Sequence, residues 1–157
     1  MIVIADTSPI NYLILIGEIE VLAHLYGGVL IPASVREELL RPRAPSIVRS
    51  WIENPPHWLE VRQPSGLPGT AESVLDPGEL DAMQLAEELS ADYLIIDEAL
   101  GRLEAQRRGL PVIGTIGVLR DAARADLLDI REVLARLRAT NFHLSLQTEQ
   151  DLLNEFE

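Results

Sequence analysis

Short apolar runs alternate with longer amphipathic stretches along most of this 157-residue chain. The runs are a few residues long and partly β-branched, which is typical of strands that are covered on both faces of a parallel sheet. We expect such strands at Ile2–Ala5, Val29–Ile31, Leu59–Arg62, Tyr93–Ile96 and Pro111–Ile113. Because strands alternate with helical stretches, the pattern predicts a three-layer α/β/α fold around a central parallel sheet of about four to five strands.

The intervening stretches have the apolar spacing of helices. We expect helices at about Ser8–Ile16, Glu18–Leu25, Ser46–Glu53, Pro77–Leu89, Glu98–Arg108, Ile116–Ala125 and Ile130–Arg138. A further helix should begin at Ser34, because Ser34 and Glu37 have the spacing of a capping box, and it should end before the prolines of residues 41–45. The length is that of one domain, so residues 1–157 are expected to form a single domain.

Two segments depart from this alternation. Residues 63–76 are rich in Pro, Gly and Ser, and a loop of this length is usual at functional sites and mobile flaps. Residues 139–157 should form a C-terminal helical tail in which Ser145–Phe156 is amphipathic and acidic. We expect this short helix to form only if its apolar face docks, either on the domain itself or on a partner chain.

Carboxylates stand at the points where a parallel sheet would bring them together. Asp6 and Asp97 each follow an apolar run directly, and residues beyond the carboxyl ends of parallel strands line the functional crevice of such sheets. Glu38 and Glu79 lie in two of the expected helices. Four such acids predict a site for a hard divalent cation, because bare carboxylates that lie side by side repel each other. Helix capping is a second interpretation for Asp6, and for Glu79 in a capping box with Asp76.

Composition excludes several other kinds of site. The chain has no cysteine, and its thirteen basic residues are all arginine. The absence of cysteine excludes thiolate nucleophiles and zinc–thiolate sites. The absence of lysine excludes a Walker A loop or a Schiff base. The histidines, His24, His57 and His143, have no paired metal-binding spacing. Carboxylates and hydroxyls are therefore the main catalytic groups that remain.

No apolar stretch approaches the roughly 20 residues that a membrane helix requires. The amino terminus has no basic region of a signal peptide, and the lack of cysteine fits a reducing compartment. We therefore expect a cytoplasmic protein with no membrane association.

The order of four motifs resembles the PIN-domain nuclease family, and within it a VapC-like toxin branch. The motifs are Asp6-Thr7-Ser8, PASVREEL, DPGELDAMQLA and LIIDEALGRLEAQRRGLPVIGTIGVL, and the resemblance covers nearly the whole chain. It implies a PIN-like fold and an endoribonuclease that cleaves RNA with Mg²⁺ or Mn²⁺. It also implies a cognate antitoxin protein and a homodimer, although the apolar positions Ile10, Leu13 and Ile14 suit either self-association or internal packing.

The resemblance assigns the catalytic and metal-binding acids to Asp6, Glu38, Glu79 and Asp97. Residues that could complete the site are Thr7, Ser8, Asp81, Glu98 and Thr115. Two departures from the family pattern stand out, since the third acid is Glu where Asp is commoner, and lysine is absent.

The net charge of −12 complicates the interpretation as an RNA-binding protein, because nucleic-acid affinity normally draws on a basic surface. Any RNA-binding surface must therefore be a small basic area on an otherwise acidic protein. The candidate RNA contacts are Arg36, Arg41, Arg43 and Arg102. Solvated helix faces or salt bridges would explain the same arginines.

Two other functions stay open: a catalytically weak binding module that acts through a protein partner, and a phosphotransferase with Asp6 as nucleophile. The second lacks the lysine that such sites normally use.

Overall fold

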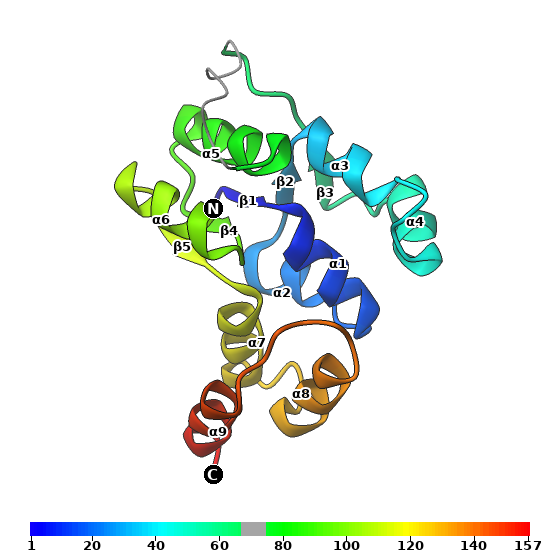
Figure 1. Ribbon diagram of the computed structural model, residues 1–157, viewed down its shortest axis with the longest axis vertical. Helices are drawn as coiled ribbons and strands as arrows, with labels where there is room; N and C mark the ends of the chain where they lie inside the picture. The colour runs from blue at the N-terminus through cyan, green and yellow to red at the C-terminus, as the bar shows by residue number, and fades with distance from the viewer. Residues whose placement is uncertain (67–74) are drawn as a thin grey trace.

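The apolar runs form a parallel sheet at the centre of the molecule (Figure 1). The computed structural model describes residues 1–66 and 75–157. Within these residues the strands are β1 (Val3–Ala5), β2 (Val29–Ile31), β3 (Leu59–Val61), β4 (Tyr93–Ile95) and β5 (Val112–Ile113). Their order is β3-β2-β1-β4-β5, and every neighbouring pair is parallel. Each strand lies within one of the predicted runs.

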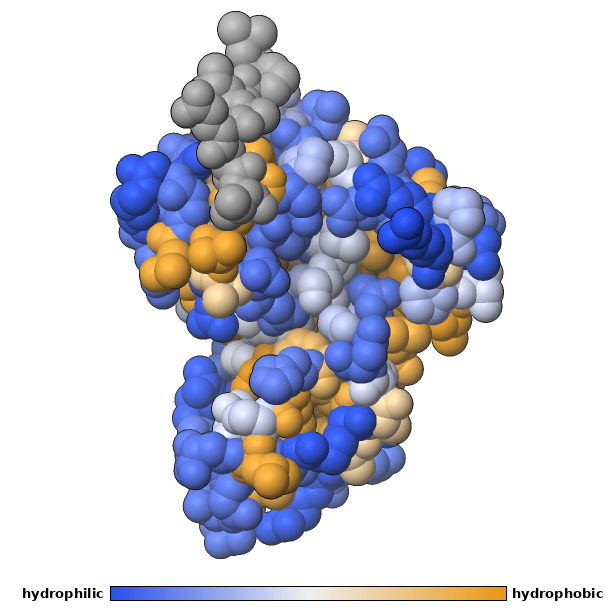
Figure 2. Space-filling model, in the orientation of Figure 1, coloured by the Kyte–Doolittle hydropathy of each residue, from blue (hydrophilic) through white to orange (hydrophobic). Residues whose placement is uncertain are grey.

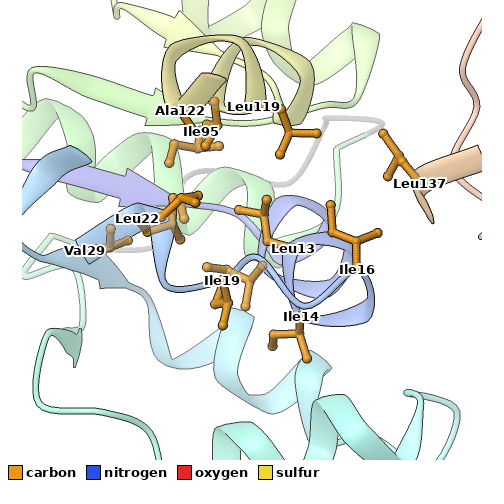
Figure 3. Packing of buried hydrophobic residues seen from close by; sticks show 14 of the residues in the cluster. Leu13, Ile14, Ile16, Ile19, Leu22, Val29, Ile95, Leu119, Ala122 and Leu137 are labelled. Atoms are coloured by element: carbon orange, nitrogen blue, oxygen red, sulfur yellow. The ribbon is translucent and has the colours of Figure 1, made fainter. Parts of the chain in front are cut away.

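Helices cover both faces of this sheet, because successive strand residues point to opposite sides. One layer contains α5 (Pro77–Leu89) and α6 (Ala99–Arg107), and the other contains α1 (Thr7–Leu15), α2 (Val21–Tyr26) and α7 (Thr115–Arg124). Ile4 and Leu94 pack with Met83 of α5, whereas Ile95 belongs to the core of the second layer. Figure 3 shows Ile95 in this second core with side chains of α1, α2 and α7. The predicted three-layer α/β/α fold is confirmed.

The remaining helices extend the second layer. They are α3 (Ala33–Leu39), α4 (Ser46–Glu53), α8 (Ile130–Arg138) and α9 (Leu146–Glu155). Ile10, Leu13 and Ile14 of α1 are buried within this layer, so their apolar face serves internal packing in the single chain.

The predicted capping box at Ser34 is wrong. Helix α3 begins at Ala33, with Pro32 instead of Ser34 at the N-cap position, and Gln63 Oε1 accepts a hydrogen bond of 3.1 Å from the Ala33 N–H. The Ser34 hydroxyl instead donates a hydrogen bond of 2.6 Å to Asp81 Oδ2 on α5. A tertiary contact between two helices has replaced the local one that the spacing favoured.

The acidic C-terminal helix docks on the chain itself. Leu152 is 3% exposed, and Leu153 and Phe156 pack against the same core. Three acids of the tail pair with arginines of α7 and α8, in the pairs Arg138–Glu149, Arg124–Glu155 and Arg131–Glu157. The apolar side of α9 therefore packs on the core of the domain, and arginines of the domain pair with the acids of the tail.

Residues 67–74, which make up most of the loop expected at 63–76, lie outside the described residues. In the two described ranges, no helix combines the length and the apolar character that a membrane crossing requires.

Truncation of Leu152 should destabilise the protein, because it would open a cavity between α9 and the core. We expect Leu152→Ala to lower the free energy of unfolding by about 2–4 kcal/mol in urea denaturation. The matched control is Leu146→Ala on the same helix, where the side chain is 77% exposed and the change should be below about 0.5 kcal/mol. Equal effects of the two substitutions would contradict the docked position of α9.

Candidate functional site

The carboxyl ends of β1 and β4 meet where the chain changes direction across the sheet. From β1 the chain builds outward to β2 and β3, and then returns to the other side of β1 as β4. Asp6 follows β1, and its backbone N–H donates a hydrogen bond of 2.9 Å to the carbonyl of Ile95 at the end of β4. Such a switch point is the usual ligand-binding position in an open α/β sheet.

A pocket of about 360 Å³ opens at this point, and we name it the acidic pocket. Its lining includes five carboxylates from four parts of the chain: Asp6, Glu38, Asp76, Glu79 and Glu98. The polar side chains of Thr7, Ser8, Asn11 and Tyr12 come from the first turns of α1. Three of the four predicted metal-binding acids, Asp6, Glu38 and Glu79, therefore share one cavity.

Helix capping holds Glu79 at the pocket. Asp76 Oδ1 accepts a hydrogen bond of 2.8 Å from the Glu79 N–H, and Glu79 Oε1 accepts one of 3.2 Å from the Asp76 N–H. This capping box uses only one oxygen of Glu79. The other oxygen, Oε2, is buried without a hydrogen-bond partner among the described residues. The cap and the site are thus compatible roles for the same residue.

A second contact sets Glu38 relative to Glu79. The hydrogen bond from Ser34 to Asp81 joins α3 to α5, and these two helices carry Glu38 and Glu79 respectively. Asp81 does not line the acidic pocket, so the structure gives it a positioning role between the helices.

Two glycines leave room for the carboxylates. A Cβ on Gly78 would lie 2.9 Å from Glu38 Oε1, and a Cβ on Gly101 would lie 2.5 Å from Glu79 Oε2. Contacts this short do not occur at real Cβ atoms, so an alanine at either position would push the acid away.

Asp6 is 5% exposed, and burial raises its pKa to about 8. The negative charges of Asp76, Glu79 and Glu38 raise the pKa further, and the backbone N–H of Thr7 offsets only part of the effect. Asp6 stands at the N-cap position of α1, yet its side chain makes no capping hydrogen bond and Oδ1 has no partner in the described part of the chain. The capping interpretation therefore does not account for Asp6.

Glu79 behaves in the same way. Burial raises its pKa to about 7, and the charge of Asp76 adds to the effect, although the hydrogen bond from the Asp76 N–H lowers the pKa. Two neighbouring carboxyl groups thus favour their neutral forms when nothing positive is present, which is the behaviour expected of a cation site without its cation.

Asp97 lies apart from the other three acids. Its carboxylate accepts hydrogen bonds from the Thr115 N–H at 2.8 Å and the Thr115 hydroxyl at 2.7 Å, and one from the Ser8 hydroxyl at 3.3 Å. Asp97 lines a neighbouring pocket that shares Ser8, Tyr12 and Glu98 with the acidic pocket. Thr115, which the sequence predicted near the site, is fully buried and holds Asp97 in place.

The predicted RNA contacts fall on two sides of the acidic pocket. Arg36 lies on α3, two residues before Glu38, and Arg41 and Arg43 are exposed just beyond that helix. Arg102 lies on α6 and lines the neighbouring pocket with Asp97.

Sequence reasoning missed Asp76, Asn11 and Tyr12 as pocket residues. Asp76 was interpreted only as a cap, but a capping box brings both of its acids to the same end of the helix. Asn11 and Tyr12 lie one turn after Thr7 and Ser8, so helical spacing alone could have placed them on the same face.

The donor set suits a hard cation, since it offers two buried carboxylate oxygens without partners and further carboxylates around one cavity. Over residues 1–66 and 75–157, however, no three Asp, Glu or His side chains are already grouped closely enough to hold a metal ion. A cation would therefore have to draw the acids of the pocket closer together.

The raised pKa of Asp6 predicts a pH dependence of stability. Without metal, folded Asp6 keeps its proton up to a pH of about 8, whereas in the unfolded chain the pKa is near 3.8. Between these values the folded state binds more protons, so the free energy of unfolding should fall as pH rises through this window, and Glu79 acts in the same direction up to about 7. Asp6→Asn should therefore be more stable than the native protein at the alkaline end, by on the order of 1–3 kcal/mol.

Urea denaturation in EDTA across this pH range measures the difference. The matched control is Asp126→Asn, because Asp126 is exposed and its positive φ of 59° is one that asparagine tolerates. If the advantage of Asp6→Asn were the same at both ends of the range, Asp6 would not be the titrating group.

Comparison with known proteins agrees with this fold. A protein-family model described as a PIN domain matches residues 2–157. Among solved structures, a PilT N-terminus domain protein from the hyperthermophilic archaeon Sulfolobus solfataricus is similar, with a TM-score of 0.54 and 18% sequence identity. The similarity covers 92% of this chain and 100% of that one, and at this identity it bears on the fold alone. No curated protein matches the chain. The family match over residues 2–157 shows that the chain belongs to the PIN-domain family.

Proposed function

We propose that this protein is an endoribonuclease that hydrolyses phosphodiester bonds of RNA and depends on Mg²⁺ or Mn²⁺. The observation that carries the proposal is the pair of buried carboxylate oxygens without partners, Asp6 Oδ1 and Glu79 Oε2, at the switch point of the sheet. A buried acceptor without a partner costs stability unless a ligand satisfies it. Membership of a family that consists generally of nucleases supports the reaction class.

Asp6, Glu38 and Glu79 would hold the cation, and Asp97 would support it from the neighbouring pocket. When bound, such an ion lowers the pKa of a coordinated water and neutralises charge on a phosphate oxygen. The oxygen-only donor set favours Mg²⁺ or Mn²⁺ over metals that prefer sulfur or nitrogen ligands.

The chain's own residues perform the remaining tasks. Ionised carboxylates of the acidic pocket repel a bare phosphate, so a cation that neutralises them favours the entry of substrate. Ser8 and Tyr12 line both pockets and supply hydroxyl groups at the place where they join. The Ser8 hydroxyl donates to Asp97 and the Tyr12 hydroxyl donates to Asn141, so each would have to exchange that partner to donate to a phosphodiester oxygen. Arg36, Arg41 and Arg43 make no ion pair with any described acid, and they are available for phosphates on the α3 side of the pocket.

A protein partner is the second part of the proposal. Leu100 and Leu103 of α6 are 50% and 63% exposed, and Leu100 lines the acidic pocket. Figure 2 shows a hydrophobic area on the flank where Figure 1 places α6. An apolar surface beside the pocket would suit an inhibitory antitoxin, whose binding would cover the entrance. Loss of co-purification of a co-expressed candidate antitoxin with Leu103→Ser would support this role, and retention would oppose it.

The reaction can be tested directly on RNA. We expect total cellular RNA to be cleaved with Mg²⁺ or Mn²⁺ and to stay intact in EDTA. Asp6→Asn should reduce the rate by at least about 100-fold, because it removes a charge from the proposed metal site, and Asp126→Asn should leave the rate unchanged. Single-stranded DNA of the same sequence serves as the comparison substrate. Cleavage that persists in EDTA, or that survives Asp6→Asn, would refute the proposed mechanism.

Metal binding can be measured without any substrate. Calorimetric titration with Mn²⁺ should show binding to the native protein that weakens by about tenfold or more in Asp6→Asn and Glu79→Gln. Gly101→Ala should have a similar effect with every carboxylate retained, because its Cβ would displace Glu79 Oε2. Thermal unfolding of each variant checks that it is folded. Native affinity in all three variants would rule out the acidic pocket as the metal site.

A further inference from the structure

The pocket beside the acidic pocket has a volume of about 860 Å³, and we name it the second pocket. Its walls come from the start of α6, the turn between β5 and α7, and the segment 141–148 that leads into α9. Figure 1 shows the chain between α8 and α9 curving back beside α7, which brings this late segment to the sheet. The volume lies within the range that small-molecule ligands occupy.

Arginines without ion pairs gather at this pocket. Among residues 1–66 and 75–157, seven of the thirteen arginines form ion pairs with acidic side chains. The others in the described chain are Arg36, Arg41, Arg43, Arg49, Arg102 and Arg120, and the last two line the second pocket. Arg120 Nε is buried with no hydrogen-bond partner among described residues. A half-buried guanidinium with an unsatisfied N–H is suited to an anionic ligand.

Aromatic side chains line the same cavity. Tyr12 and Phe142 lie edge to face, with ring centroids 5.0 Å apart and an interplanar angle of 83°. The Tyr12 hydroxyl donates a hydrogen bond of 2.8 Å to Asn141 Oδ1, which ties α1 to the segment before α9. Arginines together with aromatic rings are the combination by which proteins hold single-stranded nucleic acid, through phosphates and stacked bases.

Two acids, Asp97 and Glu98, line the second pocket beside its two arginines, and the acids of the tail lie outside it. Asp97 accepts hydrogen bonds from Thr115 and Ser8. The acids Glu149, Glu155 and Glu157 of the tail pair with arginines of α7 and α8, and none of them lines the pocket. Glu98 is the one lining acid with no such partner in the described structure, and it stands at the border with the acidic pocket.

We propose that the second pocket binds one nucleotide of a single-stranded substrate, with its phosphate at Arg102 and Arg120 and its base against Phe142. As a subsite for the RNA strand, this inference rests on the proposed nuclease function. It explains how a chain with a net charge of −12 holds a polyanion, because two arginines that pair with no described acid adjoin the acidic pocket. A strand that crosses from the second pocket passes the shared residues Ser8 and Tyr12 before it reaches the acids.

Titration with a single nucleoside 5′-monophosphate tests the pocket without any cleavage. Backbone NMR spectra in EDTA should show shifts at the turn between β5 and α7 and at residues 141–145 on addition of low-millimolar nucleotide. Arg102→Gln and Arg120→Gln should each weaken this binding about tenfold. Phe142→Leu should weaken nucleotide binding while inorganic phosphate, the second probe, binds as it does to the native protein.

The matched control is Arg131→Gln, which removes the same charge from an exposed position on α8 outside the pocket. It should leave nucleotide binding unchanged. Shifts at other residues, or equal affinity of the native protein and both pocket variants, would overturn the proposal. Equal affinity for inorganic phosphate and nucleotide would refute the base contact.

Cleavage kinetics then separate the two proposals. If the protein is a nuclease and the second pocket is a subsite, Arg102→Gln and Arg120→Gln should raise KM for single-stranded RNA more than they lower kcat. Nucleotide binding in the pocket by a native protein that never cleaves RNA would refute the nuclease and retain the pocket. Cleavage with an unchanged KM in both variants would refute the subsite and retain the nuclease.

Discussion

The burial of carboxylates at the carboxyl edge of the sheet is the constraint on which this site depends. Asp6 must follow β1 directly, and the adjacent ends of β1 and β4 enclose it, so it loses most of its hydration. Glu79 is buried in the same cavity; burial raises the pKa of both acids, and the charge of Glu79 raises the pKa of Asp6 further. Such an arrangement is unfavourable by itself, because desolvation and like charge act in the same direction. The packing of the rest of the fold must offset this cost, and a bound cation would reduce it.

The surrounding structure keeps the acids in this unfavourable arrangement. The capping box of α5 fixes Glu79 through one oxygen and leaves the other free, while the Ser34–Asp81 hydrogen bond joins the helices that carry Glu38 and Glu79. Glycines at 78 and 101 provide the space that side chains would fill. Each of these contacts is common in a layer of helices. Together they hold carboxylates around one cavity and leave some of the carboxylate oxygens without a hydrogen-bond partner in the described structure.

Charge is distributed unevenly around this centre. Seven arginines pair with acids among the described residues, and three of these pairs fasten the acidic tail to α7 and α8. Of the arginines with no ion pair in the described part of the chain, Arg36, Arg41 and Arg43 lie on or just beyond α3, Arg49 lies on α4, and Arg102 and Arg120 line the second pocket. A strongly acidic protein can therefore present local positive charge where an anionic substrate would pass, although its net charge of −12 repels such a substrate.

The sequence by itself determined the layers of the fold and the acids at the strand ends. Apolar runs of strand length and helical periodicity are local properties, so the strands and most helices, including Pro77–Leu89, lie where the pattern predicts them. The positions of Asp6 and Asp97 after β1 and β4 follow from the same pattern. Tertiary structure decided how the polar groups pair. Ser34 bonds to Asp81 and not to its own helix, Asp97 is held by Thr115 in a separate pocket, and the segment before α9 returns to the sheet. These pairings join residues far apart in the chain, and their energies depend on the packing of whole helices, which no local spacing records.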